Sequence, residues 1–484
     1  MFSSLATLTA LAALPLAATH YVRPSKPDCD AMLQSAINLY TYAYPLVILN
    51  STANSEITSD NINTFTAILQ AGPGPLPVVQ FNSDTAYLGG YFNLSQGNML
   101  VTVPDHGHLS DGKTPRFWIA QTLNAWTDVI ADPGSRTLPV GSGHSFALVG
   151  PHGSTKGLPS NATVIKSPTE LTAIIGRIYT DGTEADVELV GQLASQWMST
   201  PLDLKTNSPG ATVPTFIVPS ATMLPNITQP PDVVAEMPFM EYFSHASALL
   251  CENTPAKADL PLINNDVKKL GFSLCSRSEP FKNPEAIACC IPDNWSSLVT
   301  NHLDEMHDQI WNENRVNSWT IMPDNVGEFG TDYDFRAVVA KVVLAANKKE
   351  DALYPSATVD STNATLSSSE SYTITFPKGQ LPPSRDDVGG FWSLTYYTSD
   401  SWLGHTEKFA VRSRDELVFG NDGSFTIYVQ PEAPGDATLK ANWLPTAPND
   451  TEAFSITMRI YIPQDTALNG DWVPPPLLKA EASM

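Results

Sequence analysis

The feature of this sequence that most constrains its fold is a series of short segments after about Ala357 in which apolar and polar residues alternate. Alternation with a period of two places one set of side chains on each face of a β-strand, so that one face can be buried. GNDGS at Gly420–Ser424 predicts a tight hairpin turn between two such strands. Residues 351–480 are therefore predicted to form a β-sandwich domain from the segments YTITF, FWSLTYY, ELVFG, SFTIYVQ and AFSITMRIYIP.

A second strand-rich region spans residues 28–200 and is also predicted to be a β-sandwich domain. It begins with apolar residues at helical spacing from Asp28 to about Leu49, followed by predicted strands in PRFWIAQTLNAWTDVI and SGHSFALVGP. SPTE at Ser167–Glu170 has the pattern of a capping box, which predicts the start of a helix with Pro168 at its first position.

Residues 201–350 differ in character, because helical spacing dominates there. Helices are predicted over Val233–Leu250, Ser297–Asn312 and Phe335–Asn347, separated by Pro-rich and Cys-bearing loops. The predicted fold class is mainly β (α+β), with two β-sandwich domains and a helical middle region.

The charge balance restricts the partners of the protein. The formal net charge is −23, although only 16% of the residues are charged. Nucleic acid and anionic membranes select clustered Lys and Arg, which argues against both as partners. We expect a small-molecule ligand and no cofactor, since the chain has no GxGxxG, phosphate-binding loop or GxSxG motif. The oligomeric state is left open.

The N-terminus and the glycosylation motifs predict export. Residues 1–18 have a short apolar core followed by small residues, as in a secretory signal peptide. A secreted chain would carry glycans on sequons at its surface. Seven sequons are present, at Asn50, Asn93, Asn161, Asn226, Asn294, Asn363 and Asn449.

The five cysteines fit an oxidising compartment. Cys251, Cys275, Cys289 and Cys290 lie close together in the sequence and are predicted to form two disulfides. Cys29 then stays free, or pairs with one of the four. A zinc site is the alternative, but no CxxC pair supports it.

The first candidate for chemistry is the polar segment Asn82–Thr85, which interrupts a predicted strand between Phe81 and Tyr87. Burying an unpaired carboxylate there is costly, so Asp84 either has a fixed partner or faces a cavity. We predict Asp84 as a general acid or base, Tyr87 as a neighbouring donor and Asn82 as a substrate contact. The alternative is that Asn82 and Asp84 bond local backbone, as Asx residues do at strand breaks.

A second candidate group combines arginines and aromatic residues. Arg116 is predicted to pair with Asp84 or Asp128, or to hold a substrate oxyanion or carboxylate. Arg459 and Tyr461 lie opposite the apolar face of their predicted strand, where a cleft between the two domains could use Arg459. Three aromatic residues complete the predicted substrate-binding set, although such residues are more often part of a core than stacking platforms: Trp118, Trp126 and Trp443.

We predict no metal site. The histidines of HLDEMH at His302–His307 are five residues apart, whereas a helical HExxH site needs a spacing of four. His106, His108 and His144 could meet, but nothing in the sequence fixes their geometry.

Several motifs resemble those of secreted and periplasmic proteins that pair two domains of unknown function, numbers twelve fifty-four and twelve fourteen. YPLV, FNSDTAY, VTVPD, AWTDVIADPGSRT, FALVGP and SPTELTAIIGR are similar to the first domain. LPP, GFWSLTYY, NDGSFTIYVQ, NWLPTAP, FSITMRIYIP and DWVPPP are similar to the second. The resemblance implies two β-sandwich domains with helical additions, and it implies no reaction.

Two function classes follow from these observations. The first is an exported, cofactor-independent enzyme, an isomerase, lyase or hydrolase, acting on a small apolar molecule between the domains, for example in natural-product metabolism. The second is a non-catalytic cell-surface protein that binds carbohydrate or lipid on exposed aromatic residues. A structural secreted glycoprotein is the third alternative. A deep pocket would favour the enzyme, and an exposed aromatic row would favour the binding protein.

Overall fold

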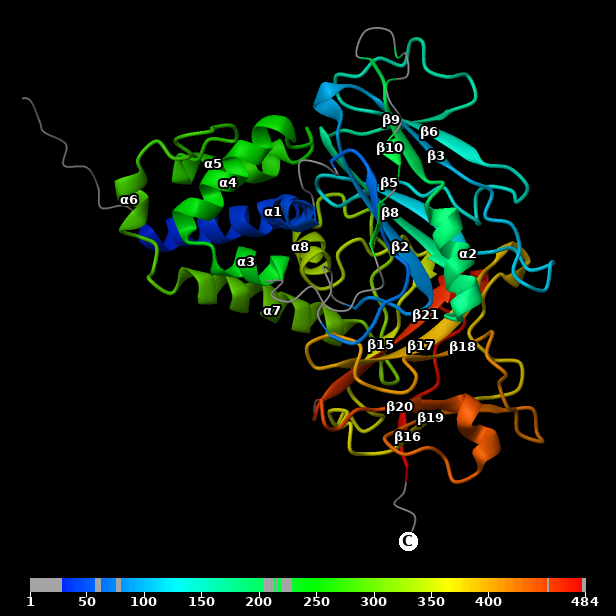
Figure 1. Ribbon diagram of the computed structural model, residues 1–484. Helices are drawn as coiled ribbons and strands as arrows, with labels where there is room; N and C mark the ends of the chain where they lie inside the picture. Colours follow the sequence, from blue (N-terminus) through cyan, green and yellow to red (C-terminus); the bar gives the residue numbers. More distant parts are fainter. Residues whose placement is uncertain are drawn as a thin grey trace, which may run out of the picture.

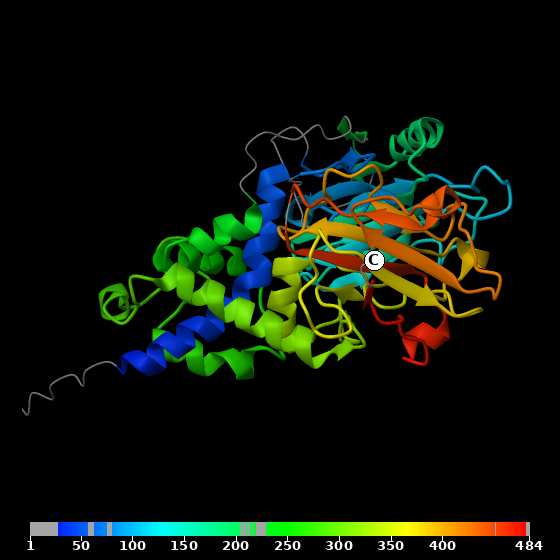
Figure 2. The same ribbon diagram turned by 90° about the horizontal axis from the view of Figure 1, so that it is seen from below.

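A computed structural model gives the arrangement of the chain (Figure 1). It describes residues 28–56, 62–74, 80–203, 207, 210, 229–450 and 452–480, and the backbone of 213–214 and 216–218. Two sheet-rich regions lie against each other, and a helical lobe lies beside them (Figures 1 and 2). This arrangement confirms the prediction of a mainly β protein with a helical region.

The N-terminal region contains a central six-stranded sheet with the order β11-β1-β2-β8-β4-β5. Strands β2 and β8 are paired along their whole length, from Thr85 opposite Tyr179 to Asn93 opposite Leu171. The strands of the sheet are β1 (Phe65–Ile68), β2 (Thr85–Asn93), β4 (Trp118–Asn124), β5 (Val129–Ala131), β8 (Leu171–Tyr179) and β11 (Phe216–Val218).

The prediction of a helix after SPTE was wrong, because LTAIIGRIY forms the central strand β8. Its β-branched residues suit a strand that is covered on both faces. Gly176 lies under a tryptophan, and a Cβ atom at this position would lie 2.9 Å from the Trp197 ring. Tertiary packing therefore outweighs the local capping pattern.

A five-stranded sheet, ordered β10-β9-β3-β6-β7, covers one face of the first sheet. The two sheets share one apolar core that includes Phe65, Leu88, Val101 and Phe146. Helix α2 (Glu184–Ala194) contributes Val190 to this core. The strands are β3 (Met99–Val103), β6 (His144–Val149), β7 (Thr163–Lys166), β9 (Met198–Pro201) and β10 (Val213–Pro214).

The C-terminal region pairs a seven-stranded sheet with a four-stranded sheet across a second apolar core. The first sheet consists of β12 (Arg315–Val316), β13 (Trp319–Thr320), β14 (Ala352–Leu353), β15 (Ser356–Ala357), β17 (Phe391–Thr398), β18 (Ala410–Arg412) and β21 (Phe454–Tyr461). The second consists of β16 (Tyr372–Phe376), β19 (Phe425–Gln430), β20 (Trp443–Pro445) and β22 (Leu478–Lys479).

The predicted hairpin turn is confirmed, since the Gly420 amide donates to the Ser424 carbonyl at 2.8 Å and Gly423 has a positive φ of 81°. The predicted strand ELVFG is wrong, because only Phe419 forms an isolated bridge there. Short helices occupy the connections, namely η1 (Leu94–Gln96), η2 (Asp386–Val388), η3 (Ala437–Asn442) and α9 (Asp465–Leu468).

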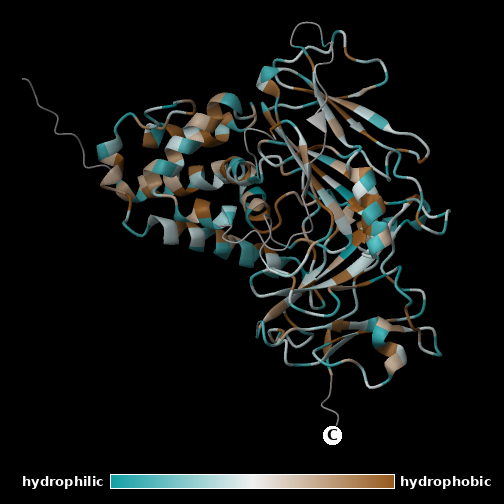
Figure 3. Ribbon diagram, viewed as in Figure 1, coloured by the Kyte–Doolittle hydropathy of each residue, from teal (hydrophilic) through white to brown (hydrophobic). Residues whose placement is uncertain are grey.

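Helix α1 (Cys29–Glu56) is the axis of the helical lobe (Figure 2). It is buried almost continuously from Leu39 to Leu49, because helices from the middle of the chain surround it. These are α3 (Pro230–Glu236), α4 (Phe239–Glu252), α5 (Leu260–Leu270), α6 (Pro284–Ala288), α7 (Trp295–Glu313) and α8 (Tyr333–Val342). Hydrophobic residues are concentrated along the strands and the inward sides of the helices (Figure 3).

Three of the helix predictions need correction in their bounds, and the one over Phe335–Asn347 extends too far, because α8 ends at Val342. Helix α1 continues past Leu49 to Glu56 and so reaches the six-stranded sheet. The predicted helix over Val233–Leu250 is two helices, because Pro238 follows the end of α3 and precedes the first turn of α4.

The disulfides join α1 to the helices around it. Cys29 pairs with Cys290, and Cys251 pairs with Cys275. Cys289 is a free, exposed thiol, so the prediction that all four clustered cysteines are bridged was wrong. Cys29 pairs with one of the four, as the alternative stated. No helix among the described residues has the length and apolar character to cross a bilayer.

The sequons differ in exposure. Asn161, Asn294, Asn363 and Asn449 are exposed, whereas Asn50 and Asn93 are half-buried. Asn226 and the predicted signal peptide, residues 1–18, lie outside the described residues. Glycosylation and export therefore stay predictions.

Removing the Cys29–Cys290 disulfide is expected to destabilise the protein strongly. The bridge closes a loop with a sequence separation of 261, and loss of such a constraint typically costs about 2–5 kcal/mol. The double variant Cys29→Ala/Cys290→Ala should therefore unfold at a clearly lower temperature in a calorimetric scan. Cys289→Ser is the matched control and should leave the melting temperature unchanged. Equal melting temperatures for all three proteins would contradict this role.

Candidate functional site

A cavity of about 100 Å³ lies between the two sheet-rich regions. Its wall is formed by the C-terminal end of α1, by β1, β2, β4 and β8, by the segment after α8, and by β21. Tyr87, Gly89 and Tyr91 on β2 share one face of the sheet, since strand side chains alternate. The opposite face packs against the five-stranded sheet, so the cavity occupies the face turned toward the C-terminal region.

Two buried arginines give the cavity a cationic end. Arg459 on β21 donates to the Gln80 carbonyl at 2.8 Å and lies next to Thr395 Oγ1 at 3.4 Å. Arg177 on β8 donates to the amide oxygens of Gln121 and Asn347 and to the Ala345 carbonyl, at 2.8–3.0 Å. Within the described residues, neither guanidinium forms an ion pair with a carboxylate.

Three tyrosines lie beside these arginines. The Tyr461 hydroxyl is buried and has no hydrogen-bond partner among the described residues, although it lines the cavity. The Tyr87 hydroxyl accepts from Asn82 Nδ2 at 2.6 Å, and the Tyr87 ring lies under the Arg177 guanidinium. Burial raises the pKa of Tyr354 above its usual value of 10, and the charges of Arg177 and Arg459 oppose that rise. Burial also raises the pKa of Tyr461 well above 10, so the Tyr354 and Tyr461 hydroxyls are neutral at physiological pH.

Glu56 provides an acidic group elsewhere on the same wall. It lies in the last turn of α1 and accepts from the Tyr91 hydroxyl at 3.3 Å. Burial raises the pKa of Glu56 from 4.5 to about 7, while the Tyr91 hydrogen bond opposes the rise. A cavity with two guanidinium groups, neutral hydroxyls and a carboxyl that titrates near neutrality can bind an anion and exchange a proton.

The predicted segment Asn82–Thr85 lies beside the cavity, but it is not part of a strand. Strand β2 begins at Thr85, so Asn82, Ser83 and Asp84 form a turn before it. The Asn82 side-chain oxygen accepts from the Asp84 and Thr85 amides at 2.8 and 2.9 Å. The alternative of local backbone bonding is therefore confirmed for Asn82. Asn82 and Tyr87 both line the cavity.

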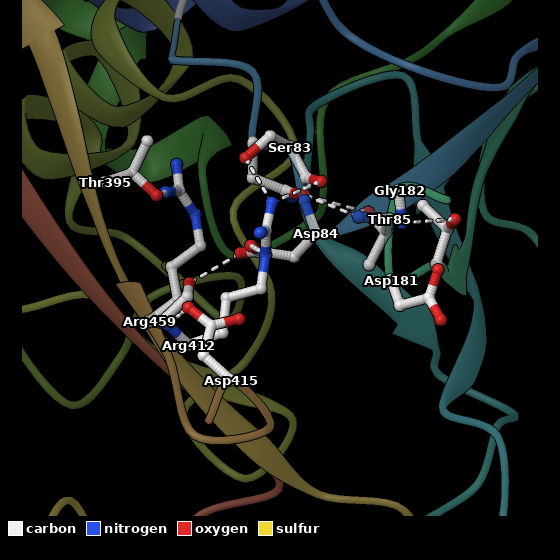
Figure 4. Close-up of polar contacts among 12 residues, drawn as sticks. Ser83, Asp84, Thr85, Asp181, Gly182, Thr395, Arg412, Asp415 and Arg459 are labelled. Carbon is white, nitrogen blue, oxygen red and sulfur yellow. Dashed lines mark hydrogen bonds and ion pairs between the residues drawn. The ribbon is translucent and has the colours of Figure 1, made fainter. Parts of the chain in front are cut away.

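Asp84 is fully buried and does not line the cavity. Its carboxylate accepts from Arg412 Nε at 2.8 Å and from Ser393 Oγ at 2.5 Å, both on the C-terminal sheet. Figure 4 shows Arg412 bridging Asp84 and Ser83 beside Arg459 and Thr395. A fixed partner thus explains the buried carboxylate, and the geometry does not support Asp84 as an acid or base toward a ligand.

The C-terminal sheet holds the whole turn through several side chains. Arg412 donates to the Ser83 carbonyl at 3.0 Å, and the Tyr397 hydroxyl donates to the Phe81 carbonyl at 2.8 Å. Arg459 binds the carbonyl of Gln80, as described above. Residues 80–84 are therefore positioned by strands that follow them by about three hundred residues in the sequence.

Arg116 lies away from the cavity. It pairs with Asp186 at the start of α2, with Nη2 at 2.7 Å from Oδ1, and donates to the Tyr179 carbonyl. The prediction of Asp84 or Asp128 as its partner was wrong. The partner, Asp186, lies on α2, and the strand pattern around Arg116 does not show that this helix packs nearby. A structural ion pair accounts for Arg116.

The three predicted tryptophan contacts also lie elsewhere. Trp118 belongs to the core between the N-terminal sheets, and Trp126 belongs to the helical core, where Arg336 lies 5.1 Å from its ring centroid. Trp443 is on β20 and donates to the Gln430 carbonyl at 2.8 Å. Of the predicted arginine and tryptophan contacts, only Arg459 lines the cavity.

His106, one of the histidines considered for a metal site, packs against two tryptophans. His106 is buried, accepts from Trp197 Nε1 at 3.1 Å and stacks on Trp118. Burial lowers the pKa of His106 to about 3, so it is neutral. The described residues contain no group of three or more His, Cys, Asp or Glu side chains that could hold a metal ion.

Sequence reasoning missed Glu56, Arg177, Tyr354 and Arg412. A single charge within the apolar run of Leu171–Tyr179 was a usable signal for Arg177, but a helix was predicted there. The sequence around Glu56 gives no sign of a role in the cavity. Glu56 reaches the sheet only because α1 points toward it.

The fold defines a mainly β protein in which a cavity is lined by residues of two sheet-rich regions and a helical lobe. The chain belongs to the family that pairs two domains of unknown function. Residues 62–201 match DUF1254, a protein of unknown function, and residues 351–465 match DUF1214, likewise a protein of unknown function. These matches confirm the resemblance predicted from the motifs.

The VPA0106 protein from Vibrio parahaemolyticus has a similar structure, with a TM-score of 0.64 and 18% sequence identity over 93% of this chain and 100% of its own. An uncharacterized protein from Burkholderia cenocepacia gives a TM-score of 0.42 and 11% identity over 93% of this chain and 94% of its own. No curated protein matches the sequence. The first likeness shows a shared fold.

Breaking the Asp84–Arg412 pair is expected to destabilise the protein by about 3–5 kcal/mol, because the remaining charge stays buried without a partner. Asp84→Asn and Arg412→Gln should each show this loss in denaturant unfolding, and the double variant should lose less than their sum. Arg277→Gln removes an exposed ion pair with Glu252 and should change stability by less than about 1 kcal/mol. Losses as small as the control's in both single variants would rule out the pair as a link between the regions.

Proposed function

We propose that this is an exported protein that binds a small, largely apolar organic acid in the cavity between its two sheet-rich regions and acts on it without a cofactor. The observation that carries the proposal is the pair of buried guanidinium groups, Arg177 and Arg459, that line the cavity with only neutral hydrogen-bond partners among the described residues.

The charge balance of the cavity supports an anionic ligand. A buried cation with neutral partners is held at a cost, because the protein interior solvates charge poorly. A carboxylate on the ligand would compensate this charge and would accept from a guanidinium in a geometry that arginine favours. The buried Tyr461 hydroxyl, which lacks a partner in the described part of the chain, adds a neutral donor.

The remainder of the wall supports an apolar body on the ligand. Leu49 from α1, Leu123 from β4, Ile175 from β8 and Leu344 from the segment after α8 all line the cavity. Sites for small molecules commonly combine such apolar walls with a few polar groups at the boundary between domains. Isomerase or lyase chemistry fits this setting, because proton transfer requires only side-chain acids and bases.

The alternative of a cell-surface protein that binds carbohydrate or lipid has less support. Such binding relies on exposed aromatic rings, and Phe419 is the only aromatic residue among the exposed large hydrophobic side chains of the described residues. The export that both alternatives share is supported by the disulfides Cys29–Cys290 and Cys251–Cys275.

Tyr461→Phe tests the proposal without disturbing the fold. The substitution removes a buried hydroxyl without a hydrogen-bond partner in the described chain, so the melting temperature should stay the same or rise. Affinity for an organic acid should fall about tenfold, the loss typical of one hydrogen bond to a charged group. Thermal shift titrations with benzoate, phenylacetate and cinnamate, each against its carboxamide, measure the affinity, and native mass spectrometry identifies any co-purified acid.

Arg459→Gln should abolish binding of the carboxylates, whereas the exposed control Arg277→Gln should bind like the wild type. The carboxamides should bind the wild type weakly or not at all. Equal binding of carboxylates and carboxamides, unaffected by Arg459→Gln, would contradict an anion site.

A further inference from the structure

We infer that the cavity takes up its organic anion together with one proton, and that Glu56 is the residue that holds this proton. This inference deepens the proposed function and rests on it, since it requires an anion at the arginines. It adds a proton-exchanging acid that the resemblance to the family does not assign.

The position of Glu56 over the sheet is the first observation. Its carboxyl lies directly above Gly89, where a Cβ atom would be only 3.3 Å from Glu56 Oε2. The absence of a side chain at Gly89 therefore makes room for the carboxyl group on the cavity wall. The Tyr91 hydroxyl, on the same face of β2, holds the other carboxyl oxygen.

The strand register places this acid on the same face of the sheet as Arg177. Arg177 is paired with Tyr87, and Ile175 is paired with Gly89. Two residues along a strand correspond to about 7 Å, so the carboxyl over Gly89 and the guanidinium of Arg177 start about one pleat repeat apart. A ligand with the dimensions of a substituted carboxylic acid could contact both.

An anion at the arginines would place a second negative charge near Glu56. Like charges in a poorly solvating cavity disfavour ionisation, so anion binding raises the pKa of Glu56 further. That pKa is already about 7 because of burial, so the carboxyl is partly ionised near neutral pH and can accept a proton on binding. At pH 5.5 it is already protonated and accepts none.

Among the described residues, the other titratable groups that line the cavity are tyrosines and arginines. Tyr91 on β2 is the nearest, and burial raises its pKa well above 10. Tyr354 and Tyr461 from the C-terminal region also have raised pKa values, with burial as the largest cause. Arg177 on β8 and Arg459 on β21 remain charged, and Tyr87 completes the set. Thr66 on β1, which also faces Glu56, does not titrate.

Because Glu56 lines the cavity, a proton on its carboxyl would lie beside the bound molecule. The same carboxyl can therefore donate a proton to the ligand or accept one from it while the arginines hold the anionic group. Glu56 would then be the acid or base of the proposed cofactor-independent chemistry.

The experiment measures proton uptake when benzoate, as the probe, binds to the full-length protein in lightly buffered solution with a pH indicator. At pH 7.5 the wild type should take up between about half a proton and one proton per bound benzoate, and at pH 5.5 almost none. Its affinity should fall by up to about tenfold per pH unit above pH 7. Glu56→Gln should take up no proton and should bind benzoate with the same affinity from pH 6 to pH 9.

Two further variants make the result specific. Tyr91→Phe removes the hydrogen bond that lowers the pKa of Glu56, so the pH at which affinity begins to fall should move upward. This shift is expected even if Glu56→Gln folds poorly. Glu252→Gln changes an exposed glutamate and should retain the uptake of the wild type.

The possible failures can be distinguished. If benzoate binds the wild type without proton uptake, and Tyr91→Phe leaves the pH profile unchanged, the inference about Glu56 is overturned while the anion site stands. If neither benzoate, phenylacetate nor cinnamate binds the wild type at any pH, the proposed function fails and the inference fails with it.

Discussion

The buried ion pair between Asp84 and Arg412 is the interaction on which the arrangement of this protein depends. It joins the turn before β2 to the C-terminal sheet, and Ser393 completes the coordination of the carboxylate. Burying a carboxylate this deeply is costly unless it has a partner of opposite sign and satisfied hydrogen bonds, so the pair strongly favours one relative position of the two regions. Specificity of assembly is its best-supported role.

The cavity follows from that arrangement. The strands that hold the turn also bring Arg459 and Tyr461 to face Arg177 and Tyr87 of the N-terminal sheet. Neither sheet alone would enclose the space, and α1 contributes Glu56 only because its last turn ends over Gly89. The polar groups of the cavity thus come from three parts of the chain, which is typical of ligand sites between domains.

Local sequence patterns predicted the strands of the C-terminal region well, and they failed where local and tertiary signals disagree. The alternation in FSITMRIY predicted which side of β21 faces the apolar core, and Arg459 and Tyr461 indeed lie opposite Ile456, Met458 and Ile460. The capping pattern SPTE misled, because the segment after it lies between β2 and β4, where pairing on both sides favours a strand. That error hid Arg177, since a helical period would not place it beside Tyr87.

The sequence by itself determined the family, the mainly β character with a helical region, and the core-facing side of β21, because motifs and side-chain periodicity are local properties of the chain. Only the tertiary structure decided that Asp84 pairs with Arg412, that Arg116 pairs with Asp186, and that Cys29 pairs with Cys290. It also decided that Glu56, Arg177 and Arg459 line one cavity. The partner of a buried charge or a cysteine is decided by which surfaces pack together in the fold. When two partners lie far apart in the sequence, the residues around each of them do not indicate the other.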